Sequence, residues 1–286
     1  MTNVILLLIS LAVVYAAFTA ARVAFDRSSD VRYYLRLAGY VYAVTISCCV
    51  GLTVGPVMYL LGRPGTTNFM VARTMAFLGP LLTGVRVRVE GADILATTNV
   101  PAVFVANHQS SLDILCLGHV FPDKVVVMAK KSIKFVPLMG WFMALANNVF
   151  VDRSNRGSAI ETMATVAVFL KKHEYGLWLF PEGTRSHQTD DSILPFKKGA
   201  FHLAVQGHIP IVPIVFSTYK PCWDPKTRTF EAGTITVKVL EPIVTTGMTV
   251  ADVDTLLDRT RLNMLAALQT IKTVRASDQV KTKKQY

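Results

Sequence analysis

Charged residues are scarce in this chain of 286 residues. Only 17% of the residues are charged, whereas 51% are hydrophobic, and the mean hydropathy is +0.39. Disordered chains are rich in charge and poor in apolar side chains, so a mainly disordered protein is excluded. The length leaves ample apolar material for a core. The composition therefore indicates a membrane-associated protein with a sizeable folded part.

Several common motifs are also missing. The sequence has no Walker-type Gly-Lys-Ser/Thr, no Gly-x-Gly-x-x-Gly and no Gly-x-Ser-x-Gly, which argues against nucleotide fingerprints and a serine hydrolase elbow. No zinc pattern occurs, and His187 with Asp190 and Asp191 is more typical of a solvated loop than of a metal site. We therefore expect no metal ion.

The four cysteines form no Cys-x-x-Cys pair and no disulfide framework. This usage suits a domain that faces reducing cytosol, with Cys116 inside an apolar helix pattern and therefore in the core. The formal net charge is +11, but no long run of Lys and Arg occurs. A nucleic-acid partner is not expected, and a membrane surface or a phosphate-bearing substrate explains the basic excess better.

The apolar residues are concentrated near the N-terminus. Residues 1–21 and 37–62 contain no charged side chain, and each stretch exceeds the roughly 20 residues that span a bilayer as a helix. The first stretch is a retained anchor or a cleaved signal peptide, and the lack of a preceding Lys or Arg favours the anchor. Residues 69–85 carry Arg73 and Pro80, which indicates an interfacial or core helix.

The topology of these segments stays open, because arginines flank both sides of residues 37–62. The connector between the two apolar stretches is basic, so it is suited to lie on a membrane surface. Its arginines are Arg22, Arg27, Arg32 and Arg36. We predict membrane-anchoring helices over residues 1–65 and an α/β domain over residues 66–286.

Short β-rich runs alternate with helical patterns from residue 85 onward, which predicts a layered α/β domain. The expected strands are residues 85–90, 102–106, 124–129, 149–151, 177–180, 211–216 and 234–240. The expected helices are residues 111–120, 134–147, 158–173, 199–206 and 252–274. Ligands of such sheets bind beyond the carboxyl ends of the strands.

A His-x4-Asp pair, His108 and Asp113, follows the strand predicted over residues 102–106. The two side chains face each other only if His108 lies in the turn after the strand and Asp113 in the first helical turn, with Ser110 or Ser111 as the N-cap. A carboxylate on one imidazole nitrogen leaves the other free to act as a base. A lone pair of this spacing is a weak signal, and a helix cap beside a buried histidine is the alternative.

Two further polar turns follow strands. Phe180–Ser186 reads FPEGTRS, where Gly183 allows close approach of the backbone to a ligand and Thr184, Arg185 and Ser186 supply donors. The strand at 149–151 leads into Asp152 and Arg153. These are either surface turns or, with Lys197 or Lys198, a ring of cations around a phosphate, which arginine grips through two parallel hydrogen bonds.

Taken together, these segments resemble the 1-acylglycerol-3-phosphate O-acyltransferases, which are membrane glycerolipid acyltransferases. The matching blocks stand in the family's order: NHQSSLD, VFVDR, FPEGTRS and IPIVPIVF, with LPFKKGAFHLA between the last two. The resemblance covers about residues 70–270. The chain departs from the family at Asn147, where the family usually has glycine, and Asn tolerates the left-handed backbone that such a turn needs.

The resemblance implies transfer of a fatty acyl group from acyl-CoA to the sn-2 hydroxyl of lysophosphatidate, giving phosphatidate. His108 would take the hydroxyl proton while Asp113 orients it, as in a triad without its serine. Arg153, Glu182 and Gly183 match the family's acceptor-phosphate positions, and Arg185 would join them. Since Glu182 is acidic, we expect it to position an arginine or a glycerol hydroxyl. No cofactor is implied, because acyl-CoA is a co-substrate.

Other hypotheses stay open at this point. The acceptor could be another lysophospholipid or glycerol 3-phosphate, the protein could be an inert membrane scaffold, or His108 could activate water in a hydrolase. Lys283 and Lys284 stand fourth and third from the end, as in dilysine retrieval signals of endoplasmic-reticulum proteins, although a solvated basic tail is the alternative. We expect an endoplasmic-reticulum membrane protein whose catalytic domain faces the cytosol.

Overall fold

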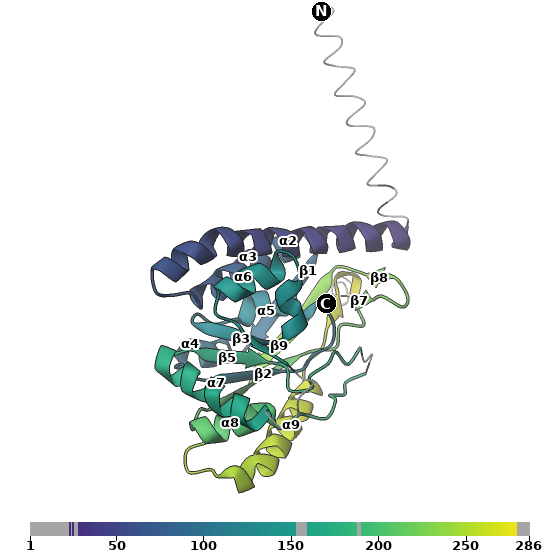
Figure 1. Cartoon of the computed structure of the whole chain (residues 1–286). Helices are drawn as coiled ribbons and strands as arrows, with labels where there is room; N and C mark the ends of the chain where they lie inside the picture. Colours follow the sequence, from purple (N-terminus) through teal and green to yellow (C-terminus); the bar gives the residue numbers. More distant parts are fainter. Residues whose placement is uncertain (1–22, 24, 26–27, 153–158, 188–189, 279–286) are drawn as a thin grey trace, which may run out of the picture.

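The computed structural model describes residues 23, 25, 28–152, 159–187 and 190–278, and its centre is a mixed sheet of eight strands (Figure 1). The strand order is β1-β9-β6-β2-β5-β3-β4, with β10 paired to β9. The central strands β6, β2, β5, β3 and β4 are parallel to one another, whereas β9 runs antiparallel to β6. The bounds are β1 Val85–Glu90, β2 Val103–Ala106, β3 Val125–Lys130, β4 Val149–Val151, β5 Gly176–Leu179, β6 Ile211–Phe216, β9 Gly233–Val239 and β10 Val274–Arg275.

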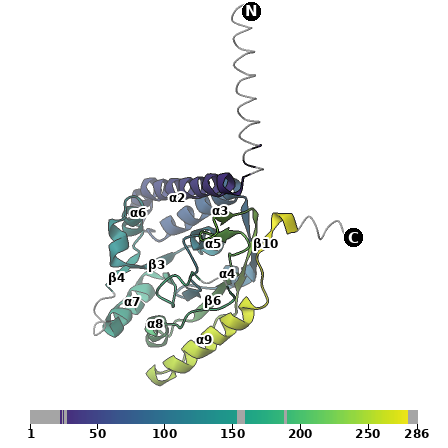
Figure 2. The ribbon, with the colours of Figure 1, turned by 90° about the vertical axis from the view of Figure 1, so that its right-hand side faces the viewer.

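Helices cover both faces of the sheet, as Figures 1 and 2 show. One face carries α2 (Ser29–Leu60), α3 (Thr66–Thr83) and α5 (Asp113–Val120), and the other carries α7 (Ala159–His173), α8 (Gly199–Gly207) and α9 (Val253–Leu268). Strand β2 is buried on both sides because its side chains alternate: Val103 and Val105 enter one core, and Phe104 enters the other. The predicted fold class, a layered mixed sheet flanked by helices, is confirmed.

Helix α2 begins earlier than the sequence predicted. It takes in Arg32 and Arg36 of the basic connector, after Ser28 caps its N-terminus by accepting a hydrogen bond from Val31 N. Both arginines, expected to lie on a membrane surface, instead pair with Glu231, which directly follows the β7–β8 hairpin, at 3.0 and 2.9 Å. The hairpin strands are β7 (Trp223–Asp224) and β8 (Thr229–Phe230). These two arginines thus tie α2 to the sheet domain.

The apolar segments have different positions in the structure. Among the described residues, α2 is the one helix long and apolar enough to cross a membrane, and 28% of its most apolar window is buried. Helix α3 sends Ala72 and Met75 into the core, in line with the prediction that residues 69–85 do not span. The predicted anchor at residues 1–21 lies outside the described residues.

Two predicted helices are wrong in extent. The single helix predicted over residues 134–147 is replaced by a short 3-10 helix, η1 (Lys131–Phe135), and by α6 (Met139–Leu145), because Pro137 keeps Val136 between them extended. The helix predicted to reach Val274 stops at Leu268. The following segment instead pairs with β9, and Thr236 Oγ1 donates to Lys272 O at 2.9 Å. Helix α4 (Ala92–Thr97) and the β7–β8 hairpin have no counterpart in the predictions.

Candidate active site

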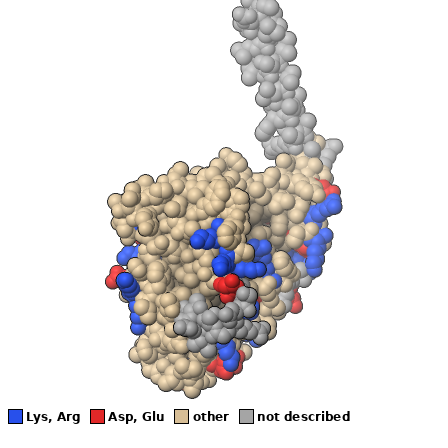
Figure 3. Space-filling view, in the orientation of Figure 1, with Lys and Arg blue, Asp and Glu red and all other residues tan. Residues whose placement is uncertain are grey.

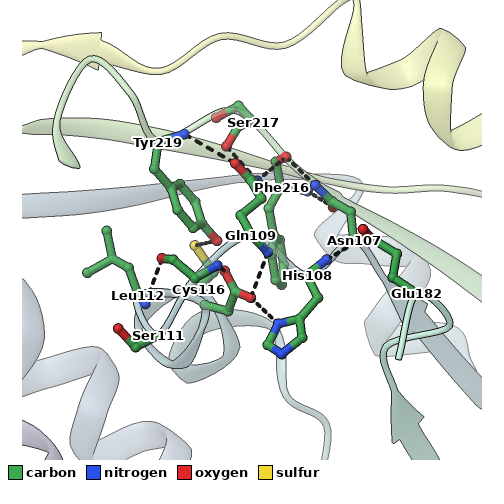
Figure 4. Close-up of polar contacts among 12 residues, drawn as sticks. Asn107, His108, Gln109, Ser111, Leu112, Cys116, Glu182, Phe216, Ser217 and Tyr219 are labelled. Atoms are coloured by element: carbon green, nitrogen blue, oxygen red, sulfur yellow. Dashed lines mark hydrogen bonds and ion pairs between the residues drawn. The ribbon is translucent and has the colours of Figure 1, made fainter. Parts of the chain in front are cut away.

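His108 and Asp113 face each other at the carboxyl end of β2. His108 Nδ1–H donates to Asp113 Oδ2 at 2.5 Å, and 20% of the His108 side chain is exposed against 2% for Asp113 (Figure 4). The turn after β2 and the first residue of α5 hold the two groups in this arrangement, as the spacing predicted. The hydrogen bond fixes the tautomer of the imidazole, so Nε2 is the nitrogen available as a base.

Asp113 itself anchors the turn, and neither serine caps α5. Its carboxylate accepts hydrogen bonds from Gln109 N at 3.0 Å and Ser110 N at 3.2 Å. The N-cap of α5 is Leu112, without a side-chain cap bond, so the prediction of Ser110 or Ser111 as N-cap is wrong. The buried carboxylate thus fixes the His108 ring and the two backbone N–H groups of the turn that leads into α5.

Two amide side chains beside His108 lock the turn to strand β6. Asn107 Nδ2 donates to Phe216 O at 3.0 Å, and Phe216 N donates back to Asn107 Oδ1 at 2.8 Å. Gln109 Nε2 donates to Phe216 O and Ser217 O, and Gln109 Oε1 accepts from Tyr219 N (Figure 4). Neither Asn107 nor Gln109 belongs to the predicted site residues. Their signal is two amide side chains on either side of His108, directly after a buried strand.

Glu182 lies beneath His108. Only 3% of it is exposed, and its carboxylate accepts from His108 N at 2.6 Å and from Leu194 N at 3.2 Å. It does not line the cavity described below. Glu182 was expected to position an arginine or a glycerol hydroxyl. In the structure its carboxylate instead holds two backbone N–H groups. Burial raises the pKa of Glu182 to about 7, against the lowering effect of these hydrogen bonds.

The loop after β5 wraps around the histidine. The rings of His108 and Phe180 stack with centroids 4.0 Å apart, and Ser186 N and His187 N donate to the carbonyl oxygens of His108 and Gln109 at 2.8 and 3.1 Å. Gly183 has φ +71°, and a side chain there would meet Lys197 Cε at 2.8 Å. The left-handed backbone therefore favours glycine, and a side chain at this position would also push the flexible end of Lys197 aside.

The imidazole opens onto a cavity of about 1410 Å³. Its cationic lining groups come from β3, the loop after β5 and the start of α8, and they are Lys130, Arg185, Lys197 and Lys198. Lys198 also pairs with Asp254 at 2.7 Å. The remaining lining is mostly apolar and comes from α2, α3, α5 and α6, with Val71, Met75, Leu117, Phe142 and Met143 among its residues. One cavity thus joins a base, a cationic region and an apolar region.

The structure describes all the other predicted site residues except Arg153. Gly183, Thr184 and Arg185 line the cavity beside His108, as does Asp152. Arg153 lies outside the described residues. Asn147 adopts φ +57°, the left-handed conformation predicted for it. Cys116 is buried in the core and accepts a hydrogen bond from Tyr219 OH at 3.4 Å, so its assignment to the core is confirmed.

The arrangement suits transfer of an acyl group to an alcohol. An oriented imidazole removes a hydroxyl proton, cations hold an anionic headgroup, and an apolar space accepts hydrocarbon. Among residues 28–152, 159–187 and 190–278, no three His, Cys, Asp or Glu side chains gather closely enough to hold a metal ion.

Comparisons with known proteins show which family this chain belongs to. The Acyltransferase family profile matches residues 86–217. A 1-acyl-sn-glycerol-3-phosphate acyltransferase of Saccharomyces cerevisiae is 41% identical over 84% of this chain and 78% of that protein. The alpha form of the same enzyme from Homo sapiens is 39% identical over 86% of this chain and 84% of that protein. This chain belongs to the 1-acyl-sn-glycerol-3-phosphate acyltransferase family. The family predicted from the four ordered sequence blocks is confirmed.

A solved structure supports the fold independently. The crystal structure of the 1-acyl-sn-glycerophosphate (LPA) acyltransferase PlsC from Thermotoga maritima superposes with a TM-score of 0.56 at 22% identity, over 82% of this chain and 98% of that chain. As an acyltransferase of this family, the protein is an enzyme of lipid synthesis, which agrees with the apolar helix α2.

Proposed function

We propose that the protein transfers a fatty acyl group from acyl-CoA to the sn-2 hydroxyl of lysophosphatidate and releases phosphatidate and CoA. The observation that carries this proposal is the His108–Asp113 pair at the wall of a cavity whose lining holds both cationic and apolar side chains. The names of the yeast and human relatives support the same acceptor.

The reaction needs no covalent enzyme intermediate. His108 Nε2 takes the proton of the acceptor hydroxyl as its oxygen forms a bond to the thioester carbonyl carbon. Asp113 stabilises the resulting imidazolium through Nδ1. The C–S bond then breaks, and the imidazolium returns the proton to the CoA sulfur. General base catalysis of this kind contributes about 10²–10⁴-fold to the rate.

The acceptor phosphate binds the cationic part of the cavity. Arg185 and Lys197 line it within the described residues, and we assign Arg153 to the same task from its sequence block. Gly183 leaves room for the Lys197 side chain to cross the loop. Fatty acyl chains occupy the apolar part, beneath α2, α3 and α6, because burying methylene groups there contributes about 0.8 kcal/mol each.

An acceptor panel tests this proposal. Membranes containing the protein are supplied with labelled acyl-CoA and with lysophosphatidate, lysophosphatidylcholine, glycerol 3-phosphate or monoacylglycerol. We expect phosphatidate as the main product. A preference for a different acceptor contradicts the assigned substrate, while CoA release without a lipid product indicates a hydrolase.

We also propose that the enzyme resides in the endoplasmic-reticulum membrane with its catalytic domain in the cytosol. The four cysteines Cys48, Cys49, Cys116 and Cys222 are unpaired thiols, which suits a reducing compartment. Protease treatment of sealed microsomes tests the orientation: we expect digestion of the catalytic domain without detergent, and full protection would contradict it.

A further inference from the structure

Residues 130–141, which we call the lip, expose apolar and basic side chains together. Phe135 is 74% exposed, Trp141 53% and Val136 43%. Lys130, Lys131 and Lys134 are exposed in the same segment. No Asp or Glu occurs between residues 124 and 151, so the segment is purely cationic. Large exposed apolar side chains inside a basic segment mark an interaction surface.

The backbone of the lip is strained at Leu138 and tightly packed at Gly140. Leu138 adopts φ +62° and ψ −60°, and Met139 N donates to Pro137 O at 2.7 Å, which is the rare strained form of the γ-turn. Gly140 is packed against the carbonyl oxygens of Ile133 and Lys134, where a Cβ would lie at 2.2 and 2.4 Å. Strain of this kind persists where a surrounding structure enforces it, and it clusters at binding sites.

The inner side of the lip belongs to the cavity wall. Ile133 and Met139 line the cavity, and so does Phe142, which directly follows the lip and packs on Gly51 of α2. The lip also packs on α2, because Leu138 and Met139 share an apolar cluster with Cys48 of that helix. Elsewhere α2 exposes apolar side chains such as Val41 and Tyr42. Figure 3 shows a broad uncharged band over the region of α2, with Lys and Arg below it. The lip thus connects the cavity to an apolar edge of the molecule.

We propose that the lip docks into the headgroup layer of a membrane that contains acidic lipids. Trp and Phe are favoured at that depth, and lysines next to it bind acidic headgroups. The ion pair between Lys131 and Asp152, at 3.9 Å, is exposed and too weak to compete. Because the lip also lines the cavity, docking brings the cavity to the level at which lipid substrates lie. This docking does not depend on which reaction the enzyme performs.

Trp141 serves as the probe. The full chain is reconstituted into phosphatidylcholine vesicles with or without phosphatidylglycerol, and Trp fluorescence is quenched by acrylamide from water or by brominated lipids from the bilayer. Subtracting the signal of Trp141→Phe removes the contributions of Trp178, which is buried, and Trp223, which is half-buried. We expect brominated lipids to quench Trp141 more, and acrylamide less, when phosphatidylglycerol is present.

A charge comparison completes the test. Lys131→Gln with Lys134→Gln should lower the ratio of docked to undocked Trp141 about 30-fold, since each lysine near an acidic surface contributes about fivefold. The matched control is Lys171→Gln with Lys172→Gln at the exposed end of α7, which we expect to behave like the unmodified chain. Equal acrylamide quenching in both lipids would overturn the proposal and favour a protein partner. The proposal would also be overturned if the variant with Lys131→Gln and Lys134→Gln docked as well as the unmodified chain.

Discussion

His108 depends on its neighbours for its position as well as for its tautomer. Asp113 holds the ring through Nδ1, Phe180 supports one face, and Glu182 holds the backbone N–H of the same residue. A shift of about 1 Å in a reacting group can cost about 100-fold in rate. These contacts therefore matter to the reaction even where they do not touch substrate.

Glu182 gives a prediction that depends on pH. Its carboxylate accepts two backbone N–H groups, whereas the amide of Glu182→Gln offers one acceptor oxygen and presents N–H to a donor. We expect about a 10- to 100-fold loss of kcat at pH 8, from displacement of His108. Since burial raises the pKa of Glu182 to about 7, the unmodified enzyme protonates this group as the pH falls from 8 to 6.

The measurement is the ratio of kcat in Glu182→Gln to kcat in the unmodified enzyme across that pH range. The ratio should rise toward low pH, because the variant has no carboxylate to protonate there. The stability of the unmodified enzyme has the opposite trend to its kcat. A raised carboxyl pKa favours the native state at low pH, and this contribution is lost as the pH rises through about 7. A constant ratio would show that Glu182 does not position His108.

Arg185 gives a second prediction at this scale. Arg185→Ala removes a guanidinium from the cavity wall, so we expect KM for lysophosphatidate to rise about 10- to 100-fold, the range for a charged hydrogen bond of about 1.5–3 kcal/mol. Monoacylglycerol lacks the phosphate, and its KM should not change. Lys226→Ala on the β7–β8 turn removes one exposed cation as a control. An equal effect on both acceptors would mean that Arg185 does not bind phosphate.

At the scale of elements, Gly183 in the loop after β5 combines a left-handed backbone with close packing of the Lys197 side chain. Gly183→Ala places a side chain at φ +71° and drives it into Lys197, whereas Gly247→Ala meets nothing within 4 Å at φ +81°. Both variants should lose about 1–2 kcal/mol of unfolding free energy, because both force a left-handed alanine.

Only Gly183→Ala should also raise KM for lysophosphatidate, since Lys197 must move away from the loop. Denaturant unfolding and acceptor kinetics on the two variants separate the effects. If Gly183→Ala has no larger effect on KM than Gly247→Ala, the packing of Lys197 on this glycine has no part in acceptor binding.

The spacing of apolar residues predicted most helices and strands, because a buried strand or an amphipathic helix repeats its apolar pattern over several residues. The strands at 85–90, 149–151 and 211–216 have the predicted bounds. Failures occurred where tertiary contacts override local preference. The helix pattern at 134–147 breaks at Pro137, and the chain after Leu268 leaves its helix to pair with β9. The short β7–β8 hairpin is stabilised by α2 through Arg36 and Glu231, which no local pattern reveals.

The sequence predicted which residues form the candidate site better than it predicted which of them contact one another. The His-x4-Asp spacing located the base, and the polar turn after β5 located Arg185. The contact of Glu182 with His108 N joins residues 74 apart in the sequence, so it follows from strand order and not from spacing. Asn107 and Gln109 reach β6 across more than 100 residues in the same way.

At the scale of the whole molecule, the sheet brings its reactive turns to one edge and α2 gives the same unit an apolar surface. The turns after β2 and β5, which are neighbours in the sheet, supply His108 and Arg185. The cavity between them reaches apolar residues of α2 and α3. The fold thus joins a polar reaction site to a space for hydrocarbon within a single cavity.

Acyl transfer to lysophosphatidate by His108→Ala tests this account most directly. The control is His173→Ala, an exposed histidine at the end of α7, with folding of both variants checked by circular dichroism. We predict that kcat falls at least about 100-fold in His108→Ala and stays unchanged in His173→Ala, because a general base contributes about 10²–10⁴-fold. Phosphatidate formation at the normal rate by folded His108→Ala would contradict the mechanism.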